Sequence, residues 1–210
     1  MKSEIPFQCH CGKVRGLAHA VSSTQNYRSI CLCDDCQAYA HFLGRAQDLL
    51  DINGGTDIYP LTPAQLKIQA GEEHLKCMRL SEKGMHRWYA GCCNTPLGNT
   101  MSPKIAFVGL PVSTFNLPTD TARTQALGPV RARVQAKWAI GTPPQGSHPH
   151  ASLGLILFAA RMFAITTLKR QHQPSPFYND DLTPKATPKV LTKSELIDLK
   201  KQSGPSPDQN

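Results

Sequence analysis

CHCG, at residues 9–12, is the stretch on which the expected fold depends, because it is typical of one half of a metal-binding knuckle. The other half is CCN, at residues 92–94. Gly12 stands where a knuckle often needs a positive φ, and Asn94 holds the matching place with a residue type that tolerates that conformation. Zinc binds four ligands tetrahedrally, with sulfur at about 2.3 Å. We therefore expect two knuckles from distant parts of the chain to close one zinc site.

Such an ion would decide whether the fold exists. Structural zinc contributes about 10–16 kcal/mol in small zinc fingers, whereas a whole domain is stable by only about 5–15 kcal/mol. The alternative is that the cysteines are ordinary core residues. Seven of the eight lie in close groups with turn residues, which favours metal binding; Cys77 stands alone, and we expect it in the core.

A second group is CLCDDC, at residues 31–36. It supplies three thiols that can reach one ion: Cys31, Cys33 and Cys36. An ion held by three protein ligands keeps a fourth position, which is open in a catalytic site and filled in a structural one.

A helix is expected directly after this group, over residues 36–43, capped by Asp34 or Asp35 and ended by Gly44. His41 is the obvious fourth ligand, but it lies about 140° from Cys36 around such a helix and points away. Tyr39 shares the face of Cys36 and could line the site, with ordinary packing as the alternative.

Composition limits the class of protein. Seventeen prolines and fifteen glycines in 210 residues favour turns and strands over a helix bundle. No apolar run follows the start, so a secretory signal is not expected, and reduced cysteines in a cytoplasmic protein are more often metal ligands than disulfides. The net charge of +8 suits an anionic partner, although no run of five Lys or Arg marks a nucleic-acid site.

The expected architecture is mainly β with short helices, an α+β fold. Residues 1–112 form a zinc-binding β domain, residues 113–172 a helical extension packed on it, and residues 173–210 a Pro-rich tail with a short helix that starts at a Thr192/Glu195 capping box. A short helix is also expected after Pro129. Strands are expected at five places: residues 56–59, 64–70, 74–80, 85–90 and 104–110.

Residues 151–170 are the most apolar stretch. A membrane span needs about 20 apolar residues, and a charge at its centre, here Arg161, costs about 2.5–3.5 kcal/mol. We therefore expect no membrane association but a buried helix, or one that faces a second copy in a homodimer.

The order of these motifs resembles the glutathione-dependent formaldehyde-activating enzyme (Gfa) and centromere protein V family. The resemblance spans roughly residues 7–110 and is carried by CHCG, CLCDDC and the stretch RWYAGCCNTPL at residues 87–97. An uncharacterised bacterial branch of that family is closer still, because it shares the CDDCQAY-like and RWYAxCC stretches and a Pro-Phe-Tyr segment like residues 176–178.

The resemblance implies an Mss4-like zinc-bearing β fold with two zinc ions. One is structural, with Cys9, Cys11 and Cys93 as matching ligands; the other is catalytic, with Cys31, Cys33 and Cys36. The family's remaining structural cysteine would fall at Ala90. Cys92 can replace it only if the chain bends, which Gly91 permits, because neighbours on a strand face opposite ways. The other candidates for this fourth ligand are His10, His86 and water.

Two functions follow from these motifs. Three thiolates and a divalent zinc ion give the site a net charge of −1. Such a zinc is better suited to binding and releasing a substrate sulfur or oxygen at its fourth position than to forming hydroxide from water. This favours the family's implied chemistry, a zinc-dependent carbon–sulfur lyase acting on a small thiol or glutathione adduct such as S-hydroxymethylglutathione. The alternative is a non-catalytic zinc module that binds a macromolecule such as nucleic acid through basic residues: Arg123, Arg131, Arg133 and Lys137.

Overall fold

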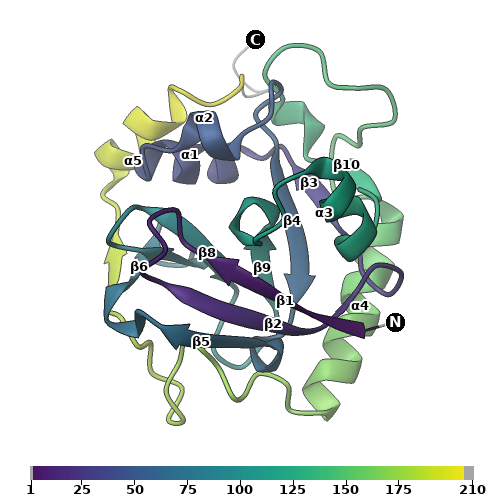
Figure 1. Cartoon of the computed structure of the whole chain (residues 1–210). Coiled ribbons are helices and arrows are strands. Elements are labelled where there is room, and N and C mark those ends of the chain that lie inside the picture. The colour runs from purple at the N-terminus through teal and green to yellow at the C-terminus, as the bar shows by residue number, and fades with distance from the viewer. Residues whose placement is uncertain (1, 206–210) are drawn as a thin grey trace.

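The structure is a computed structural model that describes residues 2–205. Two β-sheets form its framework (Figure 1). The smaller sheet has the order β1–β2–β5, with bounds β1 (Lys2–Gln8), β2 (Arg15–Ser22) and β5 (Leu66–Ala70). The larger sheet has the order β10–β3–β4–β9–β8–β7–β6–β11. Its strands are β3 (Ser29–Cys31), β4 (Thr56–Leu61), β6 (Leu75–Arg79), β7 (His86–Ala90), β8 (Thr95–Thr100), β9 (Val108–Pro111), β10 (Ala132–Val134) and β11 (Pro188–Val190).

Short helices complete the fold, and the predicted α+β class, mainly β, is confirmed. They are α1 (Asp34–Phe42), α2 (Ala46–Leu49), α3 (Asp120–Leu127), α4 (Leu153–Leu168) and α5 (Lys193–Lys200). In Figure 1, α5 lies beside α1 and α2 at one end of the molecule, and α4 runs along a flank. The predicted capping box of α5 is confirmed at Thr192 and Glu195.

Antiparallel hairpins place the two knuckles. One knuckle is the turn between β1 and β2, and the other is the turn between β7 and β8. Gly12 has φ +74° and Asn94 has φ +53°, so both positive-φ predictions are confirmed. A third hairpin, β6 to β7, turns at Ser81–Gly84, with Gly84 N donating to the Ser81 carbonyl at 3.0 Å.

Two local predictions were wrong. The cap of α1 is Cys33 rather than Asp34 or Asp35, because Cys33 is extended and its Sγ accepts a hydrogen bond from Cys36 N at 3.4 Å. Residues after Pro129 form β10 instead of a helix, since their backbone pairs in parallel with β3.

The larger sheet contains strands from all three expected segments, because its edge strands β10 and β11 come from residues 113–172 and 173–210. The Pro-rich segment also enters the core. Phe177 stacks on Trp88 with 5.0 Å between ring centroids, and the Tyr178 hydroxyl lies 2.7 Å from Thr100 Oγ1. Trp88 is fully buried. Residues 206–210 of the tail lie outside the described residues.

The apolar stretch forms a helix as predicted, but α4 is not buried within the chain. Its outward face exposes apolar side chains, of which Leu157 is 61% exposed and Leu168 86% exposed. Its other face packs through Phe163 against Phe107 and through Phe158 against Tyr27. The expectation of a buried helix was wrong for the single chain, and contact with a second copy stays a prediction.

Candidate metal centres

Four cysteines from the two knuckles meet at one point. Their Sγ atoms all lie within 4.8 Å of one another: Cys9, Cys11, Cys92 and Cys93. The shortest separations are 3.4 Å between the sulfurs of Cys11 and Cys92 and 3.6 Å between those of Cys9 and Cys11. A tetrahedron with sulfur at about 2.3 Å from its centre has edges of about 3.8 Å. The sulfur spacing therefore fits an ion of this kind, and we name this group the four-cysteine centre.

The chain bend at Gly91 is what brings Cys92 into this group. Gly91 N donates to the His74 carbonyl at 2.8 Å, and Cys93 N donates to the Ala90 carbonyl at 3.3 Å, so the strand ends at Ala90 and turns. The other side chains considered for the fourth ligand lie elsewhere. His10 contributes its backbone N–H to Thr95 Oγ1 at 2.9 Å, and His86 stacks near Trp88.

Backbone and hydroxyl donors surround these sulfurs. Val14 N donates to Cys9 Sγ at 3.2 Å, and Thr95 Oγ1 lies 3.2 Å from Cys93 Sγ. Burial opposes ionisation of Cys93, but hydrogen bonds from Thr95 and Cys11 outweigh it and lower the pKa of Cys93 to about 6. Burial raises the pKa of Cys9. Burial also raises the pKa of Cys92, so these two thiols would lose their protons on binding of a soft or borderline cation rather than before it.

Three cysteines form the second group, the three-cysteine centre. Cys31 ends β3, Cys33 caps α1 and Cys36 lies in its first turn, so one strand-to-helix junction positions all three. Their Sγ atoms lie within 4.8 Å of one another, with 3.3 Å between Cys31 and Cys33. No other His, Cys, Asp or Glu between residues 2 and 205 brings a ligand atom into this group.

A buried arginine faces the three-cysteine centre. Arg87 is 4% exposed, and its Nε and Nη1 atoms have no hydrogen-bond partner within the described part of the chain. Hydrogen bonds from Cys31 and Cys33, and then the charge of Arg87, hold the pKa of Cys36 well below its usual value. Burial opposes the charge of Arg87, but Cys36 and Cys33 outweigh it and raise its pKa. The guanidinium therefore serves as a counter-charge for thiolates.

Asn99 lies beside Arg87 as its direct partner across β7 and β8. Its side chain is also buried, and Oδ1 lacks a hydrogen-bond partner within residues 2–205. Buried polar atoms normally find partners, so unpaired donors and an unpaired acceptor side by side are the mark of a ligand site. Neither residue was predicted as part of a site; an arginine inside the apolar strand HRWYA was the available signal.

The structure places Tyr39 behind the cysteines. It is 4% exposed, its hydroxyl donates to the Trp88 carbonyl at 3.0 Å, and its ring lies 5.1 Å from the Arg87 guanidinium carbon. Tyr39 does not line the larger pocket described next, but it lines a small cavity together with Cys36, Arg87 and Asn99, so its place in the site stays a prediction. His41 is not a member of the group either, in agreement with its predicted direction.

A pocket of about 270 Å³ opens beside the three-cysteine centre. Cys31, Cys33 and Cys36 line one end of it, together with Arg87 and Asn99. Most of the remaining wall is apolar and includes the inner face of α4. The centre therefore has three thiols on one side and a ligand-sized space on the other.

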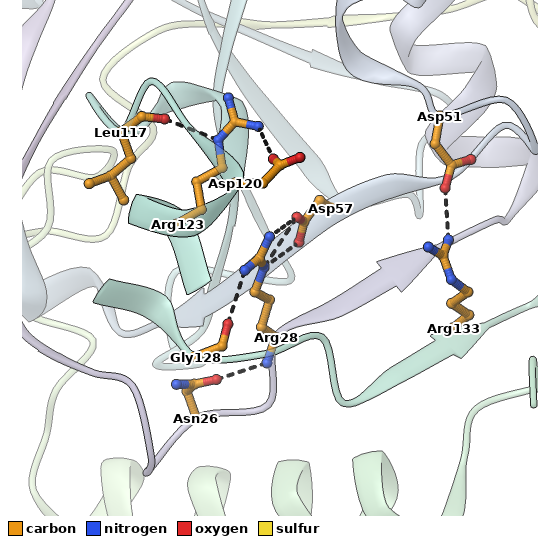
Figure 2. Close-up of polar contacts among 9 residues, drawn as sticks. All are labelled: Asn26, Arg28, Asp51, Asp57, Leu117, Asp120, Arg123, Gly128 and Arg133. Atoms are coloured by element: carbon orange, nitrogen blue, oxygen red, sulfur yellow. Dashed lines mark hydrogen bonds and ion pairs between the residues drawn. The ribbon is translucent and has the colours of Figure 1, made fainter. Parts of the chain in front are cut away.

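The basic residues expected to contact a macromolecule are engaged within the chain (Figure 2). Arg133 pairs with Asp51 at 2.8 Å, and Arg123 pairs with Asp120 at 2.9 Å while also donating to the Leu117 carbonyl. Nearby, Arg28 makes a buried pair with Asp57 at 2.6 Å. The other two contacts are Arg131 with the Thr24 carbonyl and Lys137 with the Trp138 ring. Internal acids thus pair with two of these four basic side chains.

Fold and sites together define an α+β protein with two cysteine groups that could hold metal ions. The chain belongs to a family described as a family of unknown function, DUF6151, whose profile matches residues 1–186. No curated protein matches its sequence. A solved structure of a Rhodobacter sphaeroides protein is similar with a TM-score of 0.38 and 14% identity, over 56% of this chain and 93% of that chain.

None of the helices found within residues 2–205 has both the length and the apolar character that a membrane crossing requires.

Proposed function

We propose that this protein is a zinc-dependent enzyme of the carbon–sulfur lyase type that acts on a small thiol adduct such as S-hydroxymethylglutathione. One observation carries the proposal: the three-cysteine centre borders a pocket that Arg87 and Asn99 also line, and both residues have buried side-chain atoms without a hydrogen-bond partner among residues 2–205. A purely structural centre needs neither the pocket nor the unpaired groups. The resemblance of the cysteine motifs to the Gfa family supports the same chemistry.

Zinc is the metal we propose for both centres. All-thiolate donor sets select zinc, copper(I) or iron–sulfur clusters over hard cations, and the sulfur spacing of the four-cysteine centre matches a single tetrahedral ion. We assign that centre a structural role and expect two zinc ions per chain. All eight cysteines are free thiols, which suits the reducing cytoplasm.

The residues of the pocket divide the work of the reaction. In an S-hydroxymethyl thiol, the carbon–sulfur bond breaks with its electron pair left on sulfur, the hydroxyl loses its proton, and a carbonyl forms; the released thiolate takes up one proton. Nothing is oxidised or reduced. An ion held by three thiolates would supply a Lewis acid for the substrate's sulfur or oxygen. Arg87 N–H groups would donate to the adduct oxygen as negative charge develops there, and Asn99 Oδ1 would accept from the hydroxyl group and orient it.

The charge balance at the centre supports this arrangement. Three thiolates and a divalent ion leave a net charge of −1, which the buried guanidinium of Arg87 offsets. A charge buried without a partner costs several kcal/mol, so Arg87 and the metal-loaded centre stabilise each other. Arg87 is therefore both a counter-charge and a hydrogen-bond donor that lines the pocket.

Turnover of adducts formed from formaldehyde and a thiol tests the proposal, with NMR exchange spectroscopy following the carbon–sulfur bond. The wild-type protein should accelerate exchange, and Cys33→Ser should remove the acceleration while the protein stays folded. His41→Ala is the matched control, since it changes the same helix away from the centre. X-ray absorption on the zinc protein gives the ligand count. Four protein ligands at the three-cysteine centre, or no acceleration by the wild type, would contradict the proposal.

A further inference from the structure

The pocket beside the three-cysteine centre has an apolar roof made by one face of α4. Five side chains of this helix line it: Leu155, Phe158, Ala159, Met162 and Phe163. The opposite wall comes from the larger sheet and its loops, through Ile58, Pro60, Met85 and Phe107. A ligand whose reacting end lies at the thiols would therefore have its remaining atoms against hydrocarbon and aromatic surface.

Aromatic contacts fix this roof in place. Phe163 meets Phe107 edge-on with 6.1 Å between ring centroids, and Phe158 lies 5.6 Å from the Tyr27 ring. The start of α4 is held by its cap, where Ser152 Oγ lies 3.1 Å from the Tyr27 hydroxyl. The apolar wall is thus formed in the free protein, as is usual for small-molecule pockets.

Charged groups in the wall are few. Asp35 and Arg87 are the only charged side chains among the pocket-lining residues. Asp35 is already paired with Lys200 at 2.9 Å, and Arg87 faces the thiols. Glutathione brings two carboxylates and an ammonium group, and burying such charges without partners is costly. The wall offers no cation for a second carboxylate, so it disfavours the glutathionyl body.

The size of the pocket points the same way. Its volume of about 270 Å³ is slightly below the roughly 300–1,000 Å³ that small-molecule sites occupy. A benzyl or short alkyl group fits this space and wall better than a charged tripeptide does.

We infer that the three-cysteine centre acts on adducts of a small, uncharged, apolar thiol, whose sulfur lies beside the three cysteines and whose hydrocarbon body packs under Phe158 and Met162 of α4. The adduct oxygen lies toward Arg87 and Asn99. This inference rests on the proposed lyase function and narrows its substrate class. The sequence motifs suggest a glutathione adduct as the substrate, whereas the apolar face of α4 favours an adduct of an apolar thiol.

Methionine methyl NMR on the zinc-loaded wild-type protein tests the inference without relying on turnover. Met85 and Met162 line the pocket, while Met78 is fully buried elsewhere and Met101 is exposed, so two of the methyl groups serve as internal controls. Benzyl mercaptan should shift the signals of Met85 and Met162 and bind at least ten times more tightly than glutathione. Equal or tighter binding of glutathione would overturn the inference.

A pair of variants on α4 sharpens the test. Met162→Glu places a charge in the roof and should weaken benzyl mercaptan binding tenfold or more, followed through the Met85 methyl group. Leu157→Glu makes a matched change on the outward face, where the side chain is 61% exposed, and should leave binding within twofold. Equal effects of the two variants would contradict a role for the roof. If Met162→Glu does not fold, the relative binding of benzyl mercaptan and glutathione to the wild-type protein still tests the inference.

Turnover separates this inference from the function on which it rests. Faster turnover of the glutathione adduct than of the benzyl adduct would overturn the apolar substrate class and leave the lyase function standing. Preferred binding of benzyl mercaptan with no turnover of either adduct would contradict the lyase function while supporting the apolar specificity.

Discussion

The four-cysteine centre and the three-cysteine centre use the same type of side chain, but they differ in the number of ligands and in their surroundings. The first joins two hairpin turns, from β1–β2 and β7–β8, and its four sulfurs can complete a tetrahedron by themselves. The second uses one continuous junction, from β3 into α1, and borders a pocket with Arg87 and Asn99. The number of ligands and their surroundings, rather than the type of ligand, distinguish a centre with four protein ligands from one with three protein ligands and an adjoining pocket.

Removing one sulfur from the four-cysteine centre should have the largest effect. Cys92→Ala leaves three ligands at the joint between the two sheets, so we expect loss of half of the bound metal and of about 5 kcal/mol of unfolding free energy. At roughly 2–4 °C per kcal/mol for a chain of this size, the melting temperature falls by at least about 10 °C. Metal analysis and thermal melts followed by circular dichroism measure both.

Cys77→Ala is the matched control for Cys92→Ala. The substitution also removes one sulfur, here from a buried side chain that belongs to neither centre, whereas Cys92 is half-buried. It should keep all of the metal and cost only about 1 kcal/mol. If the two variants lose the same amount of stability and of metal, Cys92 is not a ligand. The four-cysteine centre would then have only three protein ligands, as the three-cysteine centre does.

Arg87→Met should act on the three-cysteine centre alone. It removes the buried counter-charge and leaves thiolates unpaired, which we expect to cost about 3 kcal/mol and to weaken metal binding at this centre at least tenfold. Arg87→Lys keeps a charge without the planar fork and should recover part of the loss. Competition with a chromogenic chelator measures the two affinities. Equal weakening at both centres would show that Arg87 only supports the fold.

The rate of metal release compares the centres directly. A chelator can attack an ion with an open position, so release should be biphasic, with one ion lost at least ten times faster than the other. Cys33→Ser should abolish the fast phase and leave the slow one unchanged. A single phase in the wild type would mean that both ions are equally enclosed and would remove the basis for the comparison.

The cysteine groups were predictable from sequence because their spacing is local. Turn residues after each knuckle, Gly12 and Asn94, carry the φ values that the pattern predicts. The membership of Cys92 could only be an expectation, since it depends on where β7 ends and bends. A bend that starts at Gly91 is set by backbone hydrogen bonds to His74, which belongs to another strand connection.

The pocket was not predictable because its walls are assembled by tertiary packing. Arg87 and Asn99 are neighbours only through the register of β7 and β8, and the α4 roof comes from residues far along the chain. The apolar pattern of residues 151–170 gave the helix but not its position. An apolar helix can be buried, span a membrane or cover a site, and only its contacts with Phe107 and Tyr27 decide among these.

Thr95→Val should have the smallest effect, at the edge of the four-cysteine centre. The Thr95 hydroxyl accepts from His10 N at 2.9 Å and lies 3.2 Å from Cys93 Sγ, so it connects the two knuckles without being a ligand. Because partners of metal ligands tune affinity by about 10–100-fold, valine should weaken metal binding at this centre about tenfold and cost about 1 kcal/mol. Metal competition and melts measure these effects, and Thr95→Ser, which keeps the hydroxyl, should restore both. A loss at the three-cysteine centre instead would mean that the two centres are coupled through β8, and the division between a structural and a reactive centre would then no longer hold.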